Sequence, residues 1–182
     1  MKPLYFREIE SKSGQRIRFR PEESNDLEGV WALYSSLGEE SRESIPPFNR
    51  QLIERWSENL SQYTFPPILA TVPTSRKGEM VIGRAVLVHS DRPSVRHRAE
   101  FGIAVHDDYQ DQGIGTELTK FMLEIACRHG LGKGTLEVFP DNKRAIHVYE
   151  RCGFFREGLL TDHYFFRERF HDVVLMSYDC RK

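Results

Sequence analysis

The 182-residue chain is short of several features that mark specialised proteins. It has three cysteines, Cys127, Cys152 and Cys180, and no two of them are close in sequence. An odd number at these spacings does not predict a disulfide framework, and there is no C-x-x-C half-site for zinc. The seven histidines form neither H-E-x-x-H nor H-x-x-x-H. We therefore expect no metal, Cys127 and Cys152 as small core residues, and a reducing cytoplasmic setting.

Long apolar runs and an excess of one charge are also missing. The longest apolar runs, such as residues 173–176, are far too short to cross a bilayer, and residues 1–10 contain no apolar signal core. The 26 basic and 27 acidic residues leave a formal net charge of −1, which argues against electrostatic capture of nucleic acid. We therefore expect no membrane or nucleic-acid partner.

The composition is that of an ordinary folded chain. Hydrophobic residues make up 39% and charged residues 29%, which argues against intrinsic disorder. The length suits one hydrophobic core. We expect a single domain over residues 1–182, with residues 1–13 as an N-terminal arm.

The spacing of apolar residues predicts alternating strands and helices. Period-2 and short apolar runs predict strands at 16–20, 68–72, 80–89, 99–105, 135–139, 154–155 and 170–178. Helical spacing predicts helices at 26–37, 50–61, 113–129 and from a cap at 141 or 142 to 151. The order of these elements is typical of a mixed α/β fold, in which a strand-to-helix loop is a natural anion site.

One such loop carries a glycine motif. Residues 110–116 read Gln-Asp-Gln-Gly-Ile-Gly-Thr between a predicted strand and a predicted helix. Gly113 and Gly115 lack the Cβ atoms that would keep a ligand away from the backbone, and free amides at a helix start favour a phosphate. The spacing matches neither G-x-G-x-x-G nor the P-loop. Alone, the motif is equally compatible with tight packing of the helix on the strand.

A second motif follows in the next predicted helix. Residues 142–154 read N-x-x-A-I-x-x-Y-E-x-x-G-F, which puts Asn142, Ala145, Ile146 and Tyr149 on one helical face. Together the two motifs resemble the acetyl-CoA-binding core of the GNAT acetyltransferase superfamily, strongly over residues 100–154 and weakly in the tail. The resemblance implies a single-domain α/β fold with a mixed central sheet of about six to seven strands flanked by about four helices.

The resemblance also implies an activity. It points to an acetyl-CoA-dependent N-acetyltransferase that acetylates a primary amine by direct attack in a ternary complex. Residues 33–42 look loosely like a stretch of protein-lysine acetyltransferases, which favours a protein lysine or N-terminal amine slightly over a small amine, amino acid or polyamine. The alternative is a non-catalytic acyl-CoA-binding regulatory module. A homodimer through the terminal strands is compatible with the family.

The coenzyme site is implied residue by residue. Backbone amides of the glycine loop would hold the pyrophosphate, although Gln112 stands where the family loop has a basic residue. The preceding strand would offer its main chain to the pantetheine arm and polarise the thioester carbonyl. Asn142 would meet the pantetheine or stabilise splayed strand ends. The residues implied to bind acetyl-CoA are Ile103, Ala104, Val105, Gln110, Asp111, Gln112, Gly113, Ile114, Gly115, Thr116, Asn142 and Tyr149.

The chemistry requires a proton donor and a base. A phenol with a pKa of about 10 can protonate a leaving thiolate of about 8.5, the role that the resemblance gives Tyr149. A lysine amine with a pKa of about 10.4 must lose a proton. Glu100 resembles the glutamate of protein-lysine-acetylating members, and Glu137 that of ribosomal N-terminal acetylating members. The sequence leaves Glu100, Glu137 and a positioned water open as the base.

The tail contains a cluster of aromatic residues, Tyr164, Phe165, Phe166 and Phe170. Such a cluster is compatible with a wall of the acceptor pocket, and equally with the packing of an edge strand.

Overall fold

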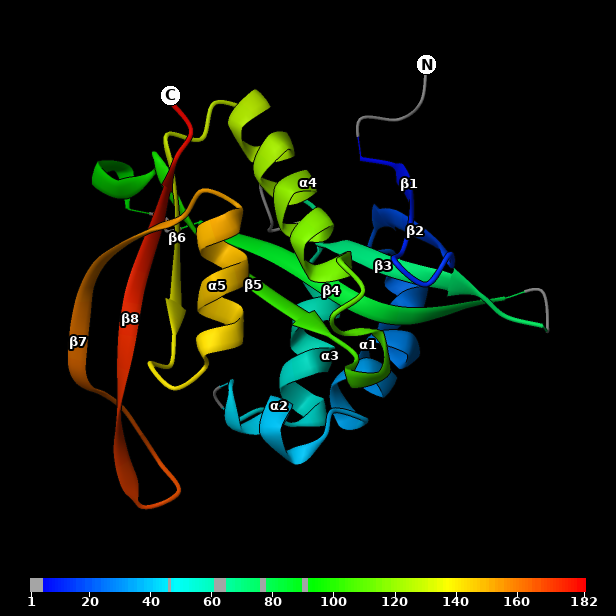
Figure 1. Cartoon of the computed structure of the whole chain (residues 1–182), viewed down its shortest axis with the longest axis horizontal. Helices are drawn as coiled ribbons and strands as arrows, with labels where there is room; N and C mark the ends of the chain where they lie inside the picture. Colours follow the sequence, from blue (N-terminus) through cyan, green and yellow to red (C-terminus); the bar gives the residue numbers. More distant parts are fainter. Residues whose placement is uncertain (1–4, 46, 61–64, 76–77, 90–91) are drawn as a thin grey trace.

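The computed structural model describes residues 5–45, 47–60, 65–75, 78–89 and 92–182. Within these residues eight strands form one sheet in the order β1-β2-β3-β4-β5-β6-β8-β7 (Figure 1). The strands are β1 (Arg7–Glu10), β2 (Arg16–Pro21), β3 (Ile68–Pro73), β4 (Glu79–His89), β5 (Arg98–Val105), β6 (Lys133–Val138), β7 (Phe155–Phe166) and β8 (Arg169–Asp179). Neighbouring strands are antiparallel except β5 and β6, which are parallel.

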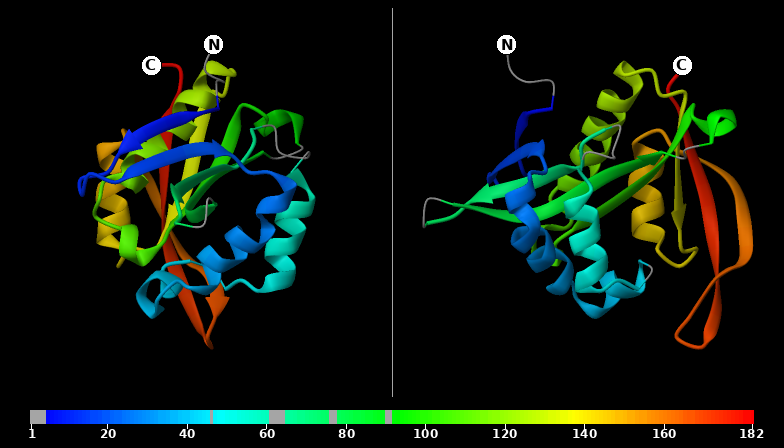
Figure 2. Two further views of the ribbon diagram at one scale, coloured as in Figure 1. Left: turned by 90° about the vertical axis from the view of Figure 1, so that its right-hand side faces the viewer. Right: turned by 180° about the vertical axis from the view of Figure 1, so that it is seen from behind.

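Helices cover both faces of this sheet. Those in the described residues are α1 (Leu27–Ser35), α2 (Glu39–Glu43), α3 (Arg50–Glu58), α4 (Ile114–Arg128) and α5 (Lys143–Arg151). α4 and α5 lie on one face, and α1 and α3 lie on the other, as the front and back views show (Figures 1 and 2). The short α2 lies at the lower end of the molecule in Figure 1, toward the tip of the β7–β8 hairpin.

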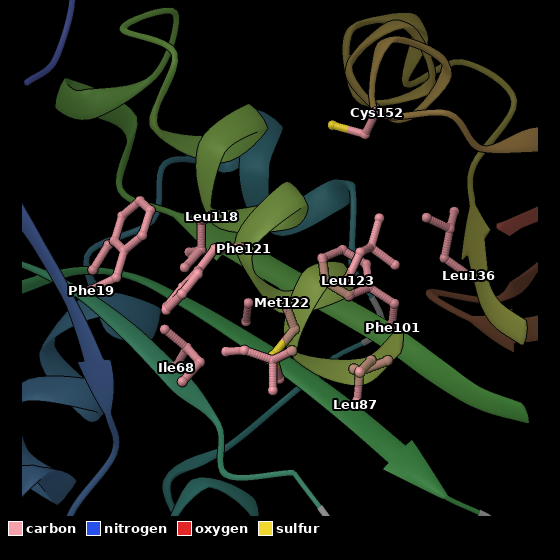
Figure 3. Packing of buried hydrophobic residues seen from close by; sticks show 14 of the residues in the cluster. Phe19, Ile68, Leu87, Phe101, Leu118, Phe121, Met122, Leu123, Leu136 and Cys152 are labelled. Carbon is pink, nitrogen blue, oxygen red and sulfur yellow. The ribbon is translucent and has the colours of Figure 1, made fainter. Parts of the chain in front are cut away.

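The main core lies between α4 and the sheet. α4 turns Leu118, Phe121 and Met122 toward the strands, where they pack against Phe19 and Ile68 (Figure 3). All five side chains are at most 2% exposed. Burying a large apolar side chain contributes about 1.5–3 kcal/mol. This packing therefore holds α4, and the loop that precedes it, firmly against β5.

A second core lies under α1 and α3. Val30 and Leu33 of α1 and Ile53 of α3 pack on Leu69 and Val81 of the sheet. Since α2 follows α1 after three residues, this packing places α2 near the end of β5.

A buried ion pair lies at the edge of this second core. Arg84 Nε donates a hydrogen bond of 2.6 Å to Glu22, whose other oxygen accepts one of 2.8 Å from the Ser57 hydroxyl. Both charged side chains are almost fully buried. The pair joins the end of β2, α3 and the middle of β4.

The strands β5 and β6 diverge. Their recorded pairing runs from Arg98↔Lys133 to Glu100↔Thr135, although β5 continues to Val105 and β6 to Val138. β5 stays paired with β4 up to Val105, and β6 with β8 up to Val138. The sheet therefore opens between β5 and β6 beyond Glu100.

Most predicted elements are confirmed, with ends that differ by a few residues. The mixed α/β class is confirmed, with eight strands and five helices in the described residues where about six to seven and about four were expected. The predicted arm contains strand β1, the segment 39–43 forms α2, and β7 extends to Phe166. Residue 61, at the end of the helix predicted at 50–61, and residues 76–77, between the strands predicted at 68–72 and 80–89, lie outside the described residues.

The cysteines depart from expectation. Cys127, near the end of α4, forms a disulfide with Cys180, which follows β8. Their Cα atoms are 5.1 Å apart, within the range that a disulfide spans. The two residues are 53 positions apart in sequence, so only the packing of α4 beside β8 brings them together. The expectation that Cys127 is a free core residue is therefore wrong, whereas Cys152 is a buried free thiol.

Reducing the Cys127–Cys180 disulfide should lower the free energy of unfolding by about 2–4 kcal/mol, because the bond limits the freedom of the unfolded chain. Urea unfolding of the wild-type chain with and without reductant measures this difference. A Cys127→Ala/Cys180→Ala double variant is the control, and its midpoint should not respond to reductant. Equal wild-type midpoints in both conditions would contradict the disulfide.

Candidate active site

The glycine loop has the backbone shape of an anion-binding turn. Gly113 is the N-cap of α4 with a φ of 85°, and Asp111 has a φ of 58°. The backbone of both residues is therefore in the left-handed region. A non-glycine residue in this region is strained, and such strain concentrates at functional sites. No side chain caps the N-terminus of α4. The amides of its first turn are therefore left for a ligand or water.

Tight packing does not explain the two glycines. A Cβ atom at Gly113 would lie 3.9 Å from the nearest atom, Lys12 Cε, and one at Gly115 would lie 3.7 Å from Val105 Cγ2. Both are ordinary van der Waals distances, so neighbouring side chains leave room for alanine at either position. Gly113 is required by its positive φ, and Gly115 lines the cavity described below.

Asp107, just after β5, ties this loop to α2. Its carboxylate accepts hydrogen bonds from the Gly38 amide at 2.5 Å, from the Ser41 hydroxyl, and from Gln110 Nε2 at 2.8 Å. Partial burial disfavours the charged carboxylate, but the bonds from Ser41 and Gly38 outweigh it and lower the pKa of Asp107 below its ordinary value. Gln110 also donates to the Val105 carbonyl at 3.0 Å. The Gln110 side chain is thus used within the protein, and its backbone amide donates a hydrogen bond of 3.1 Å to the Asp107 carbonyl.

A cavity of about 320 Å³ occupies the opening between β5 and β6. The glycine loop, α2 and the β7–β8 hairpin all contribute to its walls. The residues that line it are Leu37, Glu40, Ser41, Ser44, Ile45, Glu100, Phe101, Gly102, Ile103, Ala104, Val105, Gln110, Gly115, Thr119, Glu137, Val138, Phe139, Asn142, Arg144, Ala145, Val148, Tyr149, Tyr164 and Val173.

The structure brings most of the predicted site residues to this cavity. Ile103, Ala104 and Val105 line it from β5, and beyond Glu100 no strand in the described residues is recorded as pairing with β5 on the β6 side. Asn142 lines it too, and its Oδ1 accepts a hydrogen bond of 3.0 Å from the Ala145 amide, capping α5. The loop residues Asp111, Gln112, Gly113, Ile114 and Thr116 are not among the lining residues; they lie beside Gln110 and Gly115, at the end of the cavity that the glycine loop forms.

Tyr149 of α5 lines the cavity, and its ring packs against two other aromatic rings. Its ring lies 6.3 Å from that of Phe101 and 5.8 Å from that of Phe154, both in edge-on orientations. Burial raises the pKa of Tyr149 well above its ordinary value. Its hydroxyl forms no hydrogen bond with another described residue. The phenol therefore stays protonated and has a proton to donate into the cavity.

The two candidate bases have different surroundings. Glu137 accepts a hydrogen bond of 2.6 Å from the Tyr164 hydroxyl, and its other oxygen lies 3.4 Å from His163 Nε2. Glu100 has neither a hydrogen bond nor an ion pair among the described residues. Partial burial, and then the nearby charge of Glu137, raise the pKa of Glu100 above its ordinary value. A free carboxylate with a raised pKa is better suited to accept a proton near neutral pH.

The tail aromatics divide between the two predicted roles. Tyr164 lines the cavity. Phe165 and Phe170 are 65% and 63% exposed and pack on each other with ring centroids 4.9 Å apart. Phe166 packs against Phe139, with ring centroids 6.0 Å apart. Only Tyr164 of the four is therefore part of the cavity wall.

Sequence reasoning missed contacts that shape the site. Ser41 and Asp107 hold α2 to the loop, and Arg167 in the β7–β8 turn forms an ion pair of 2.9 Å with Glu43 of α2. The polar turn after β5 hinted at Asp107, but nothing in the sequence pairs residues so far apart. Across the described residues there is no cluster of three metal-ligating side chains, and none of their helices is long and apolar enough to span a membrane.

Comparisons with known proteins agree with this geometry. Residues 30–154 match the Acetyltransferase (GNAT) family. The chain is 34% identical over 83 residues to a spermidine N(1)-acetyltransferase of Vibrio cholerae, covering 45% of this chain and 48% of that one. It is 32% identical over 77 residues to the [ribosomal protein bS18]-alanine N-acetyltransferase of Escherichia coli, covering 42% and 52%. The matches thus span about half the length of these curated relatives.

A solved structure extends the similarity to the whole fold. The yncA acetyltransferase of Salmonella typhimurium, solved with its cofactor acetyl-CoA, superimposes with a TM-score of 0.75 at 16% identity and covers 90% of this chain and 94% of that one. The predicted GNAT fold is confirmed. The family match covers more than half of the residues, and the two motifs and the shared fold agree with it. The chain therefore belongs to the Acetyltransferase (GNAT) family.

Proposed function

We propose that this chain is an acetyl-CoA-dependent N-acetyltransferase in which a primary amine attacks the thioester directly in a ternary complex. One observation carries the proposal. A single cavity is lined at once by Gly115 of the glycine loop, by the free carboxylate of Glu100 and by the protonated phenol of Tyr149. Donor and acceptor can therefore meet without a covalent enzyme intermediate.

The coenzyme would lie along the opening of the sheet. The backbone amides that follow Gln110 in the glycine loop, those of residues 111–116, bind the diphosphate, and the edge of residues 103–105 hydrogen-bonds the pantetheine arm as an added strand would. An amide of this edge also stabilises the oxyanion that forms on the thioester carbonyl. Acetyl-CoA is the cofactor of the Salmonella structure, which supports this choice of ligand.

The reaction would use Glu100 and Tyr149 in turn. Glu100 takes a proton from the ammonium group of the acceptor, directly or through water, and the amine nitrogen then attacks the thioester carbon. When the tetrahedral intermediate collapses, the C–S bond breaks and Tyr149 protonates the leaving thiolate. The nitrogen loses its second proton, which returns through water to the Tyr149 phenolate. Glu137 accepts a hydrogen bond from Tyr164, and its negative charge raises the pKa of Glu100. The unpaired state of Glu100 is what favours it over Glu137.

The acceptor end of the cavity suits a cationic amine. Glu40 of α2, Glu100 and Glu137 all line the cavity, so its walls attract an ammonium group before it loses its proton. A protein lysine or N-terminal amine is proposed first, and a small amine, amino acid or polyamine second. The ribosomal-protein and spermidine relatives represent these two classes. A cytoplasmic location and a homodimer stay predictions.

Tyr149→Phe should lower kcat by roughly 10²-fold, because the leaving thiolate loses its proton donor while the ring packing is kept. The measurement is thiol release from acetyl-CoA with a panel of amines, including a lysine peptide, a peptide with a free N-terminus and spermidine. Tyr178→Phe is the matched control, since it removes a hydroxyl outside the cavity. CoA binding without turnover on any amine would instead favour the regulatory-module alternative.

The pH dependence should separate the two glutamates. With Glu100 as base, kcat/KM falls as pH drops through its raised pKa, so the acid limb lies above the ordinary glutamate value of about 4.3. Glu100→Gln should remove this limb. Glu137→Gln should keep it but move it to lower pH, because the charge that disfavours ionised Glu100 is gone. An unchanged limb in Glu100→Gln would assign the base elsewhere.

A further inference from the structure

The side chains of the glycine loop carry negative charge, which is unfavourable for binding a phosphate. Residues 106–116 contain three aspartates, Asp107, Asp108 and Asp111, and no lysine or arginine. The Asp107 carboxylate is held by hydrogen bonds from Gly38 and Ser41, whereas the other two carboxylates are 84% and 80% exposed. A multiply charged phosphate approaching this loop meets repulsion that backbone amides alone must overcome. A cation from another part of the chain would remove this obstacle.

The turn between β1 and β2 brings such a cation. The Lys12 amide donates a hydrogen bond of 3.1 Å to the Gln112 carbonyl, and the Ser13 hydroxyl donates one of 2.7 Å to Gln112 Oε1. These two bonds dock the β1–β2 turn onto the loop about a hundred positions away in sequence. The backbone of Lys12 is therefore held in place even though its side chain is exposed.

The ammonium group of Lys12 lies over the loop itself. Its Nζ donates a hydrogen bond of 3.2 Å to the Asp111 carbonyl, and its Cε is the nearest atom to the position of a Cβ at Gly113, at 3.9 Å. It forms no ion pair with any described carboxylate. Two of its three N–H donors therefore remain for a ligand beside the first amides of α4.

The other cation near the loop is already engaged. Arg144 of α5 lies 3.7 Å from an Asp111 carboxylate oxygen and donates a hydrogen bond to Gln110 Oε1. Its charge is thus partly used to neutralise the loop. Lys12 is the loop cation whose charge no described carboxylate balances.

We infer that Lys12 binds a phosphate group of the coenzyme and so supplies, from the N-terminal hairpin, the positive charge that the glycine loop lacks. The inference rests on the proposed function, because the ligand is the coenzyme. Both the diphosphate and the 3′-phosphate of coenzyme A offer anionic oxygens that an ammonium group can bind.

The test is the Kd of coenzyme A for the full chain, measured by calorimetry. Lys12→Met should raise this Kd about 5- to 30-fold, the range expected for losing one charge-assisted contact, and Lys12→Arg should restore most of the affinity. Lys120→Met, which removes an equal charge from the exposed side of α4, should leave the Kd within twofold of the wild-type value. The KM for acetyl-CoA should rise in Lys12→Met with kcat unchanged.

Dephospho-coenzyme A distinguishes the two phosphates. If the effect of Lys12→Met persists with this ligand, Lys12 contacts the diphosphate; if it disappears, Lys12 contacts the 3′-phosphate. Wild-type binding of coenzyme A with a Lys12→Met Kd within twofold would overturn the Lys12 assignment alone. An equal increase of the Kd in Lys120→Met would overturn it too, because it would show that affinity follows the net charge of the chain. No binding by the wild-type chain would overturn the proposed function together with it.

Discussion

The separation of β5 from β6 is the constraint on which the site depends. Two parallel strands that stay paired leave no room between them, and here the recorded pairing stops at Glu100↔Thr135 while both strands continue. Each strand is held on its outer side, β5 by β4 and β6 by β8, so the opening does not close. The resulting cavity exposes one edge of β5 to a ligand and places Glu100 where the two strands part.

The packing of the two cores positions the elements that line the cavity. The core between α4 and the sheet fixes the first turn of α4, and with it the amides proposed to bind the diphosphate. The second core fixes α1, and Asp107 then ties α2 to the glycine loop. Because the glycine loop and α2 share this carboxylate, the position of one depends on the position of the other. The Arg167–Glu43 pair adds the β7–β8 hairpin to the same framework.

The sequence predicts those parts of the protein whose signals are local. The glycine loop and the face of Asn142 and Tyr149 are each visible within about a dozen residues, and the long amphipathic α4 follows from its apolar spacing. Strand β1 has four residues, and α2 has five polar ones, so neither shows enough periodicity to be predicted. The Cys127–Cys180 bond and the contact of Lys12 with the loop join residues far apart in the chain. Such pairs depend on how the elements pack, which spacing in one sequence does not reveal.

The central claim is that the opening between β5 and β6 holds the thioester end of acetyl-CoA beside Tyr149. A crystal structure of the chain with coenzyme A tests it most directly. The account predicts the pantetheine arm along residues 103–105 and the sulfur within about 3.5 Å of the Tyr149 hydroxyl, the reach of a hydrogen bond to sulfur. A coenzyme bound elsewhere, or a sulfur directed away from α5, would contradict it.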